Sequence, residues 1–161
     1  MLRQENGYGC GVYAVANALN MKEFVTSERL EASKENGNNF AQLNKWLLEE
    51  GKNFQIQVKY FKDGVQFRTP RLKVFYEGAD DLICVPALVT YNTPRCKRNH
   101  MIALSCYPDG TLHVFDSCKS EPDYYLSWDD FREHYKRIIS LSGFVSFENE
   151  NVYLAKQNGK S

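Results

Sequence analysis

Residues 4–19 read QENGYGCGVYAVANAL, in which Cys10 stands between two glycines and directly before a run with helical spacing. The apolar side chains that recur three and four residues apart in this run are Val12, Val15, Ala16 and Leu19. Cys10 is therefore expected at or near a helix N-terminus, where the helix dipole and free backbone N–H groups favour thiolate over thiol. Because thiolate is the nucleophilic form, the sequence predicts a reactive cysteine, and the flanking glycines allow a sharp turn and a close substrate approach.

A nucleophilic thiol needs a base, and His100 has the most suitable context among the three histidines. It opens an apolar run that predicts a strand, and the turn sequence YPDG at 107–110 leads into a returning strand that ends at Asp116. A three-residue loop pairs position 107 with position 111 and makes His100 and Asp116 diagonal neighbours on one face. We then expect the carboxylate to accept a hydrogen bond from one imidazole nitrogen and to hold the other toward the thiol. A two- or four-residue loop would reverse this parity. The histidines expected to be ordinary packed or exposed residues are His113 and His134.

Gln4 supplies a fourth part. It stands six residues before Cys10, so its side-chain amide can point back over the helix start. Together with the Cys10 backbone N–H it can donate to a developing oxyanion. Gln4, Cys10, His100 and Asp116 then form a complete set for acyl transfer.

These residues resemble the C39-like branch of papain-like cysteine peptidases, which includes the N-terminal peptidase domains of bacteriocin-exporting transporters. The resemblance begins with Arg3-Gln4, followed after five residues by Cys10-Gly11 before a helix of small residues. It continues with HMIAL at 100–104 and an aspartate sixteen residues after the histidine. The sequence YLSWDDF at 125–131 is similar to the start of the family's closing helix, so the resemblance covers about residues 2 to 142.

The resemblance implies an α+β, papain-like fold of two lobes. An N-terminal helical lobe carrying the Cys10 helix would pack on an antiparallel β-sheet carrying His100 and Asp116. Cys10 would be the nucleophile, His100 the base, Asp116 the orienting acid and Gln4 the oxyanion donor. The chain departs from the family pattern after the aspartate, where Ser117-Cys118 replaces the usual proline. The resemblance does not extend to a transporter segment, so the substrate stays open.

The sequence thus predicts a thiol peptidase that acts on a peptide or protein substrate with no cofactor and no metal. Two alternatives stay open. The same triad serves acyltransferases of the transglutaminase type, and the same fold can be a non-catalytic binding module.

Length and composition narrow the class of protein further. The 161 residues predict a single domain, 1–161, long enough to bury a sizeable core. Because 20 basic residues balance 20 acidic ones, charge gives no argument for nucleic acid or an anionic membrane as partner. The five cysteines have no framework spacing, and neither a signal peptide nor a long apolar span is recognisable. We therefore expect a cytoplasmic protein.

Zinc is the alternative chemistry for the cysteines. Cys96 and His100 have a spacing that could chelate a metal, with Cys106 and Cys118 as further thiolates. However, the chain has no Cys-x-x-Cys pair, and Cys84, Cys106 and Cys118 stand in apolar, strand-like contexts. Small buried cysteines are common in such contexts, so we expect no metal.

The remaining patterns predict helices mainly in the first half and strands in the second. Helices are expected from Thr26 to about Gly37, from Asn38 or Asn39 to Gly51, and from Ser127 to about Arg137. Strands are expected at 54–60 and 72–76, with a turn at 63–64 between them, and at 82–91 with a bulge at Pro86. Residues 144–147 and 152–154 are expected to form a final hairpin.

Overall fold

The computed structural model describes residues 1–3, 8–34, 37–61, 84–91, 99–106 and 111–147. Its elements are α1 (Cys10–Leu19), the short 3-10 helix η1 (Lys22–Phe24), α2 (Ser27–Ala32), α3 (Phe40–Glu49), β1 (Phe54–Phe61), β2 (Cys84–Tyr91), β3 (Asn99–Cys106), β4 (Leu112–Phe115), β5 (Asp123–Tyr125), α5 (Trp128–His134) and β6 (Tyr135–Ser146). The predicted order, helices first and then mainly strands, is confirmed. The turn at 63–64, the strand at 72–76 and the second half of the final hairpin lie outside the described residues.

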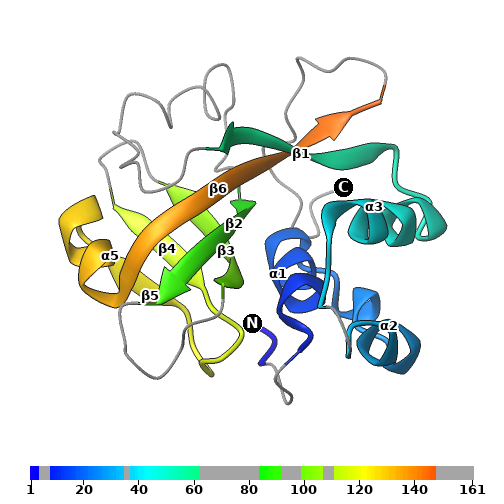
Figure 1. Cartoon of the computed structure of the whole chain (residues 1–161), viewed down its shortest axis with the longest axis horizontal. Helices are drawn as coiled ribbons and strands as arrows, with labels where there is room; N and C mark the ends of the chain where they lie inside the picture. The colour runs from blue at the N-terminus through cyan, green and yellow to red at the C-terminus, as the bar shows by residue number, and fades with distance from the viewer. Residues whose placement is uncertain (4–7, 35–36, 62–83, 92–98, 107–110, 148–161) are drawn as a thin grey trace.

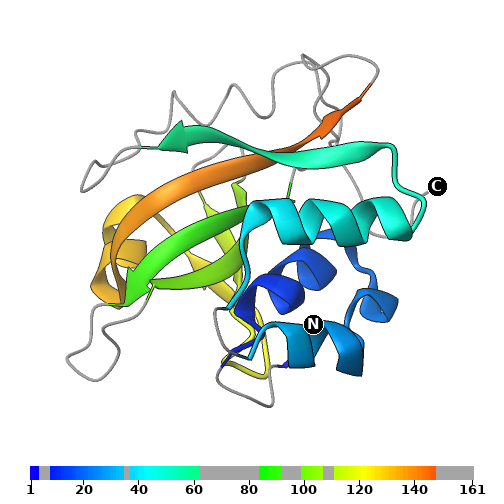
Figure 2. The same ribbon diagram turned by 45° about the vertical axis from the view of Figure 1, so that its right-hand side comes forward.

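The strands form one antiparallel sheet with the order β1-β6-β2-β3-β4-β5. The twelve-residue strand β6 pairs with β1 on one side and with β2 on the other. Figures 1 and 2 show α1, α2 and α3 grouped beside the sheet and α5 at the other end of it. The predicted α+β class with an antiparallel sheet is therefore confirmed.

Helix α1 is the central helix of the core. It contacts β2, β3 and β4 of the sheet, and it also contacts η1 and α3. Its residues are buried on nearly every side, which is the pattern of a helix enclosed by other elements. The alanines at 14, 16 and 18 let the neighbouring elements approach closely. Asn20 ends the helix in the left-handed conformation with φ 52°, which asparagine tolerates.

The next two helices begin at the predicted caps. Thr26 accepts a hydrogen bond from the Arg29 backbone N–H at 3.2 Å, and Asn39 accepts one from the Gln42 backbone N–H at 2.8 Å. Side-chain oxygens at these positions satisfy donors that the first helical turn leaves without a partner. Helix α2 ends at Ala32, so the predicted end near residue 37 is wrong. After α3, glycine 51 takes φ 77°, a left-handed conformation that suits glycine and ends the helix.

The core joins α1 and α3 to the faces of β1, β3 and β6. The edge-on contact of Phe54 with Phe144, with ring centroids 5.6 Å apart, connects β1 with β6 inside it. Among the described residues, the largest fully buried side chains are Tyr135, Phe24, Phe131, Phe144, Leu19, Leu43, Leu47, Ile102, Leu104 and Leu112. Burying such side chains stabilises the fold by about 1.5–3 kcal/mol each relative to leaving them exposed.

Two further predictions are wrong, one about the end of a helix and one about a bulge in a strand. The helix that opens at Ser127, whose Oγ accepts from the Asp130 backbone N–H at 3.3 Å, ends at His134 rather than near residue 137. Strand β6 begins at once at Tyr135, because β2 supplies the pairing partner there: Tyr91 pairs with Tyr135, and Thr90 pairs with Arg137. The predicted bulge at Pro86 is also misplaced. Pro86 pairs in regular register with β3 and lies just outside the ladder with β6, whose irregularities fall later in β2.

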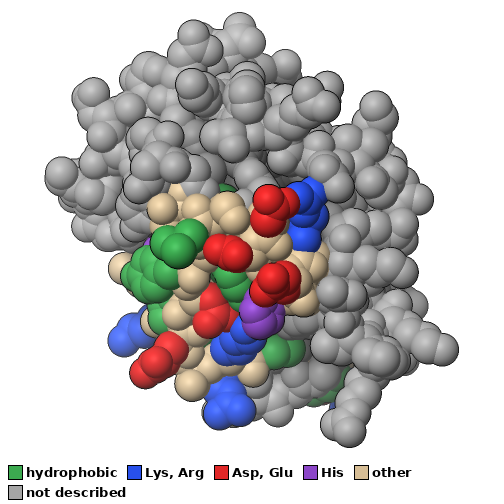
Figure 3. Space-filling view, turned by 90° about the vertical axis from the view of Figure 1, so that its left-hand side faces the viewer, with side chains coloured by type: hydrophobic (Ala, Val, Ile, Leu, Met, Phe, Trp, Pro, Cys, Tyr) green, Lys and Arg blue, Asp and Glu red, His purple; other side chains and the backbone are tan. Residues whose placement is uncertain are grey.

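The end of the molecule formed by β4, β5 and α5 has a mixed surface. Figure 3 shows acidic, basic and apolar side chains interspersed on this face. Its most exposed large apolar side chains are Tyr124 and Leu126, with exposed fractions of 64% and 79%. In the described part of the chain, no helix combines the length and apolarity needed to cross a membrane.

Candidate active site

Cys10 is the first residue of α1, where the sequence predicts it. Gly9 is the N-cap, and its carbonyl accepts the Tyr13 backbone N–H at 3.1 Å. The Cys10 side chain is half-buried and packs against the core. The dipole of a ten-residue helix thus favours negative charge at the thiol.

Asn38 satisfies a backbone donor in the first turn of α1. Its Oδ1 accepts from the Val12 N–H at 3.2 Å, and its Nδ2 donates to Ser33 Oγ at 2.6 Å and to Gln42 Oε1 at 3.3 Å. The sequence identifies Asn38 or Asn39 as the cap of α3. In the structure Asn39 caps α3, whereas Asn38 serves α1 from a position 26 residues away in the chain.

The close approach of Asn38 explains why glycine follows Cys10, and it yields a stability prediction. A Cβ at Gly11 would lie 2.6 Å from Asn38 Cβ and 2.8 Å from its Oδ1. We expect Gly11→Ala to destabilise the protein by about 1–3 kcal/mol in urea denaturation, because the asparagine must move away from the helix. In an Asn38→Gly background the same substitution should cost markedly less. An equal cost in both backgrounds would contradict this explanation.

The hairpin of β3 and β4 brings His100 and Asp116 together. Its register pairs Ala103 with Phe115 and Cys106 with Leu112, which is the register predicted from a three-residue loop. His100 is the second residue of β3, and Asp116 directly follows β4. Their side chains meet with His100 Nε2 2.8 Å from Asp116 Oδ1, and both are buried. The predicted imidazole–carboxylate bond is confirmed.

The Asp116 carboxylate has two further donors. The Cys118 backbone N–H donates to Oδ1 at 3.0 Å, and the Tyr135 hydroxyl donates to Oδ2 at 2.7 Å. Tyr135 is fully buried and its ring stacks on Phe131, with centroids 4.7 Å apart. These hydrogen bonds fix the position of both carboxylate oxygens, and the carboxylate in turn fixes the orientation of the imidazole ring.

Sequence reasoning missed Tyr135 because it placed this residue inside a helix. At the junction of α5 and β6 the backbone turns to φ −120° and ψ 117°, and the ring enters the core. A signal was available: a buried tyrosine hydroxyl needs a hydrogen-bond partner, and an aspartate at the end of an apolar strand offers one.

The Tyr135 hydroxyl makes a testable contribution. Tyr135→Phe keeps the ring and its stacking but removes one donor from a buried carboxylate. We expect a loss of about 1–3 kcal/mol in the free energy of unfolding. Because Tyr135 acts through Asp116 and His100, Cys10 alkylation near neutral pH should also slow. A variant that is destabilised but whose alkylation–pH profile is unchanged would show a role in stability alone.

The electrostatics favour a charged Cys10–His100 pair. Burial alone raises the pKa of the Cys10 thiol. The hydrogen bond and positive charge of His100, together with the backbone N–H groups of Met101 and Gly11, outweigh burial and lower this pKa below its ordinary value. Burial likewise works against a charged imidazole. Hydrogen bonds with Asp116, Cys10 and Cys118 outweigh it and raise the pKa of His100 to about 12. Nε2 is the ring nitrogen that bonds Asp116.

Of the four residues predicted from the sequence, three come together and one is not placed. Cys10, His100 and Asp116 form one connected group, whereas Gln4 lies outside the described residues. The other histidines lie elsewhere, as predicted. His113 stacks on the ring of Tyr124 with centroids 4.1 Å apart, and His134 is exposed at the end of α5.

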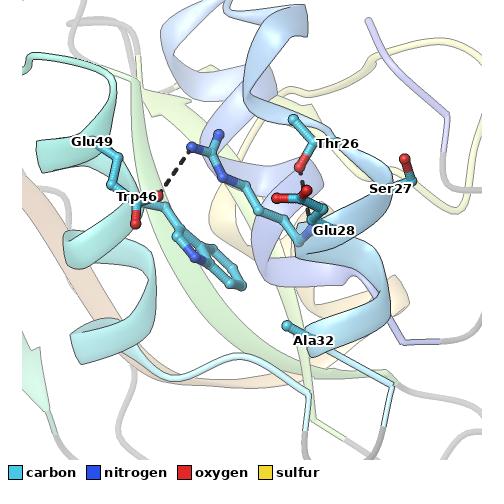
Figure 4. Close-up of a pocket in the computed structure, with 7 residues that line it drawn as sticks. Thr26, Ser27, Glu28, Ala32, Trp46 and Glu49 are labelled. Carbon is cyan, nitrogen blue, oxygen red and sulfur yellow. Dashed lines mark hydrogen bonds and ion pairs between the residues drawn. The ribbon is translucent and has the colours of Figure 1, made fainter.

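A separate hollow of about 480 Å³ lies between α2 and α3 (Figure 4). Arg29 forms part of its wall and is ion-paired with Glu50 at 2.8 Å and Glu49 at 3.5 Å. Its guanidinium also donates to the Phe24 carbonyl at 3.1 Å and lies 5.9 Å from the centre of the Trp46 ring. These contacts connect η1, α2 and α3, so Arg29 has a structural role here.

Cys10, His100 and Asp116 thus form one chain of contacts from thiol to imidazole to carboxylate. A thiolate at a helix N-terminus, bonded to an imidazole that is held by a buried carboxylate, can form a covalent intermediate with an acyl group. In comparisons with known proteins, no family model matches the chain and no curated protein is significantly similar to it.

Proposed function

We propose that this protein is a thiol peptidase of the papain-like, C39-like type, with Cys10 as nucleophile, His100 as general base and Asp116 as orienting acid. The observation that carries the proposal is a chain of contacts. It begins at the Cys10 thiol, at the start of a buried helix, and runs through His100 to Asp116. The two-lobed arrangement belongs to the same proposal. Helices α1–α3 would form one lobe and the sheet the other, with α1 seated against β3.

The reaction follows from this geometry. The Cys10 thiolate attacks the scissile carbonyl carbon, and the oxyanion accepts hydrogen bonds from the Cys10 N–H and, as the sequence predicts, the Gln4 amide. Protonated His100 gives its proton to the leaving amine as the C–N bond breaks, leaving a thioester on Cys10. Neutral His100 then takes a proton from water, which attacks the thioester. The carboxylic acid product leaves, and the thiolate–imidazolium pair re-forms.

The identity of the partner follows from the same chemistry. An acyl-transfer site of this kind acts on a peptide or protein that presents a carbonyl to Cys10. Neither a cofactor nor a metal has a step in this mechanism. A cytoplasmic location stays a prediction from the sequence.

A peptide library tests the proposal. A broad, proteome-derived peptide mixture is incubated with the protein in H2¹⁸O, with glycine amide added as a competing acceptor, and the new termini are read by mass spectrometry. We expect new C-termini that carry ¹⁸O, produced by the wild type and by Cys96→Ala but not by Cys10→Ala. Products joined to glycine amide with no ¹⁸O would indicate an acyltransferase. The absence of any Cys10-dependent product would contradict the proposal and favour a binding module.

A further inference from the structure

A second cysteine lies beside His100, on a turn that Asp116 itself organises. The Cys118 backbone N–H donates to Asp116 Oδ1 at 3.0 Å, and the Lys119 backbone N–H donates to the Asp116 carbonyl at 2.9 Å. One ligand atom each from His100, Asp116 and Cys118 can be chosen so that all three lie within 4.8 Å of one another. Cys118 is exposed whereas the other two are buried, so this set can be reached from the surface.

The three ligand types match the preferences of Zn²⁺. Imidazole nitrogen, carboxylate oxygen and thiolate sulfur bind it at about 2.0–2.3 Å, which places tetrahedral ligands about 3.3–3.6 Å apart. The sulfur lies within reach of such positions, and the His100–Asp116 pair must open by a few tenths of an ångström from 2.8 Å. A fourth position is left for water.

Contacts around the carboxylate support this arrangement. The Tyr135 hydroxyl holds Oδ2 at 2.7 Å, whereas Oδ1 is the oxygen 2.8 Å from the imidazole Nε2. Hydrogen bonds to a ligating carboxylate orient it toward a metal and strengthen binding. The set also differs from the one that the sequence offered, because it needs neither Cys96 nor Cys106.

We propose that His100, Asp116 and Cys118 bind one Zn²⁺ ion and that the bound ion blocks the chemistry of Cys10. Binding releases two protons to solvent, one from His100 Nε2 and one from the Cys118 thiol. Zn²⁺ then forms one bond each to the His100 nitrogen, an Asp116 oxygen and the Cys118 sulfur. The imidazole then cannot become the imidazolium that protonates a leaving amine. This inhibitory consequence rests on the proposed peptidase function, whereas binding itself does not.

Calorimetric titration with Zn²⁺ alone, under reducing and non-chelating conditions, tests the site. We expect one equivalent to bind the wild type, Cys10→Ala and Cys96→Ala with similar affinity. Cys118→Ala should bind more than about tenfold more weakly, since loss of a direct ligand costs at least as much as loss of an outer-shell partner. Cys118→Ser keeps the backbone bond to Asp116 and the size of the side chain, and it should be weakened in the same way.

Co²⁺ gives an independent readout. Thiolate-to-cobalt absorption should appear in Cys10→Ala and vanish in Cys118→Ala. Wild-type affinity in Cys118→Ala, its loss in Cys10→Ala or Cys96→Ala, or the absence of stoichiometric binding would each overturn the proposed site. If Zn²⁺ binds as expected but does not slow Cys10-dependent cleavage, the inhibitory consequence is wrong. If the protein has no such cleavage activity, the proposed function fails while the metal site stands.

Discussion

Replacing Cys10 with alanine should abolish peptide cleavage and leave the fold intact. In the proposed mechanism the Cys10 thiolate forms the covalent bond to the acyl group, and its hydrogen bond to His100 joins it to the base. We expect turnover to fall by more than about 10³-fold, as in other enzymes that lose a nucleophile acting together with its base. Alanine suits a helix and leaves the core packing of α1 in place. Measurement of cleavage beside circular dichroism separates loss of chemistry from loss of structure, with Cys96→Ala as the matched control.

The same substitution should expose the charged pair through the pH dependence of stability. Because the pKa of His100 is raised, protonated His100 stabilises the fold, fully so below pH 6.5, the ordinary pKa of histidine. This stabilisation is lost as the pH rises toward about 12. Because the pKa of Cys10 is lowered, the Cys10 thiolate stabilises the fold, fully so above pH 9.0, the ordinary pKa of cysteine. This stabilisation is lost as the pH falls. Between pH 6.5 and 9.0 the unfolded chain holds one proton on these two groups. Wherever the folded pair is thiolate and imidazolium it also holds one, so the two effects cancel there.

In Cys10→Ala this cancellation disappears. The folded variant keeps a proton on His100 while the unfolded chain holds none, so its stability should fall with rising pH. The slope approaches about 1.4 kcal/mol per pH unit, the value for one proton exchanged. Urea denaturation of both proteins across this window measures the effect. Parallel stability curves would mean that Cys10 is an ordinary thiol.

Asp116→Ala should be among the most destabilising single substitutions in the described chain. One buried carboxylate accepts from His100, from the Cys118 backbone and from the Tyr135 hydroxyl. Its removal takes the counter-charge from a buried imidazole and one acceptor from each of the other two donors. We expect a loss of about 3–5 kcal/mol in the free energy of unfolding at pH 7, the usual effect of breaking a buried charge pair.

Asp116→Asn is the matched variant. Its amide has the same shape and keeps one accepting oxygen, so it should cost less, about 1–3 kcal/mol. It should nevertheless reduce cleavage, because a neutral amide cannot stabilise the imidazolium as a carboxylate does. A loss of less than about 1 kcal/mol for Asp116→Ala, the net value of a single hydrogen bond, would contradict the central role of this carboxylate.

Local patterns in the sequence were enough to predict much of the fold and of the site. Helical spacing predicts α1, cap residues predict the starts of α2, α3 and α5, and turn chemistry predicts the register that joins His100 to Asp116. Each of these features depends on residues close together in the chain, or on one hairpin with a short loop.

Features that depend on distant partners could not be predicted in this way. The DDFREHYKR segment favours a helix throughout, yet Tyr135 begins a strand because it pairs with Tyr91 of β2, which is distant in the chain. The bond from Tyr135 to Asp116 spans 19 positions, and the bond from Val12 to Asn38 spans 26. Strand β5 is only three residues long, too short for its alternation to be recognised.

The rate of Cys10 alkylation as a function of pH tests the central claim most directly. Iodoacetamide labelling of each cysteine is followed by peptide mass mapping, in the wild type and in His100→Ala. We predict rapid Cys10 labelling with an inflection below the ordinary value of 9.0, and an upward shift of that inflection in His100→Ala, where only the backbone N–H groups of Met101 and Gly11 still oppose the effect of burial. Cys10 labelling no faster than that of exposed Cys118, with the same inflection in both proteins, would contradict the thiolate–imidazolium pair.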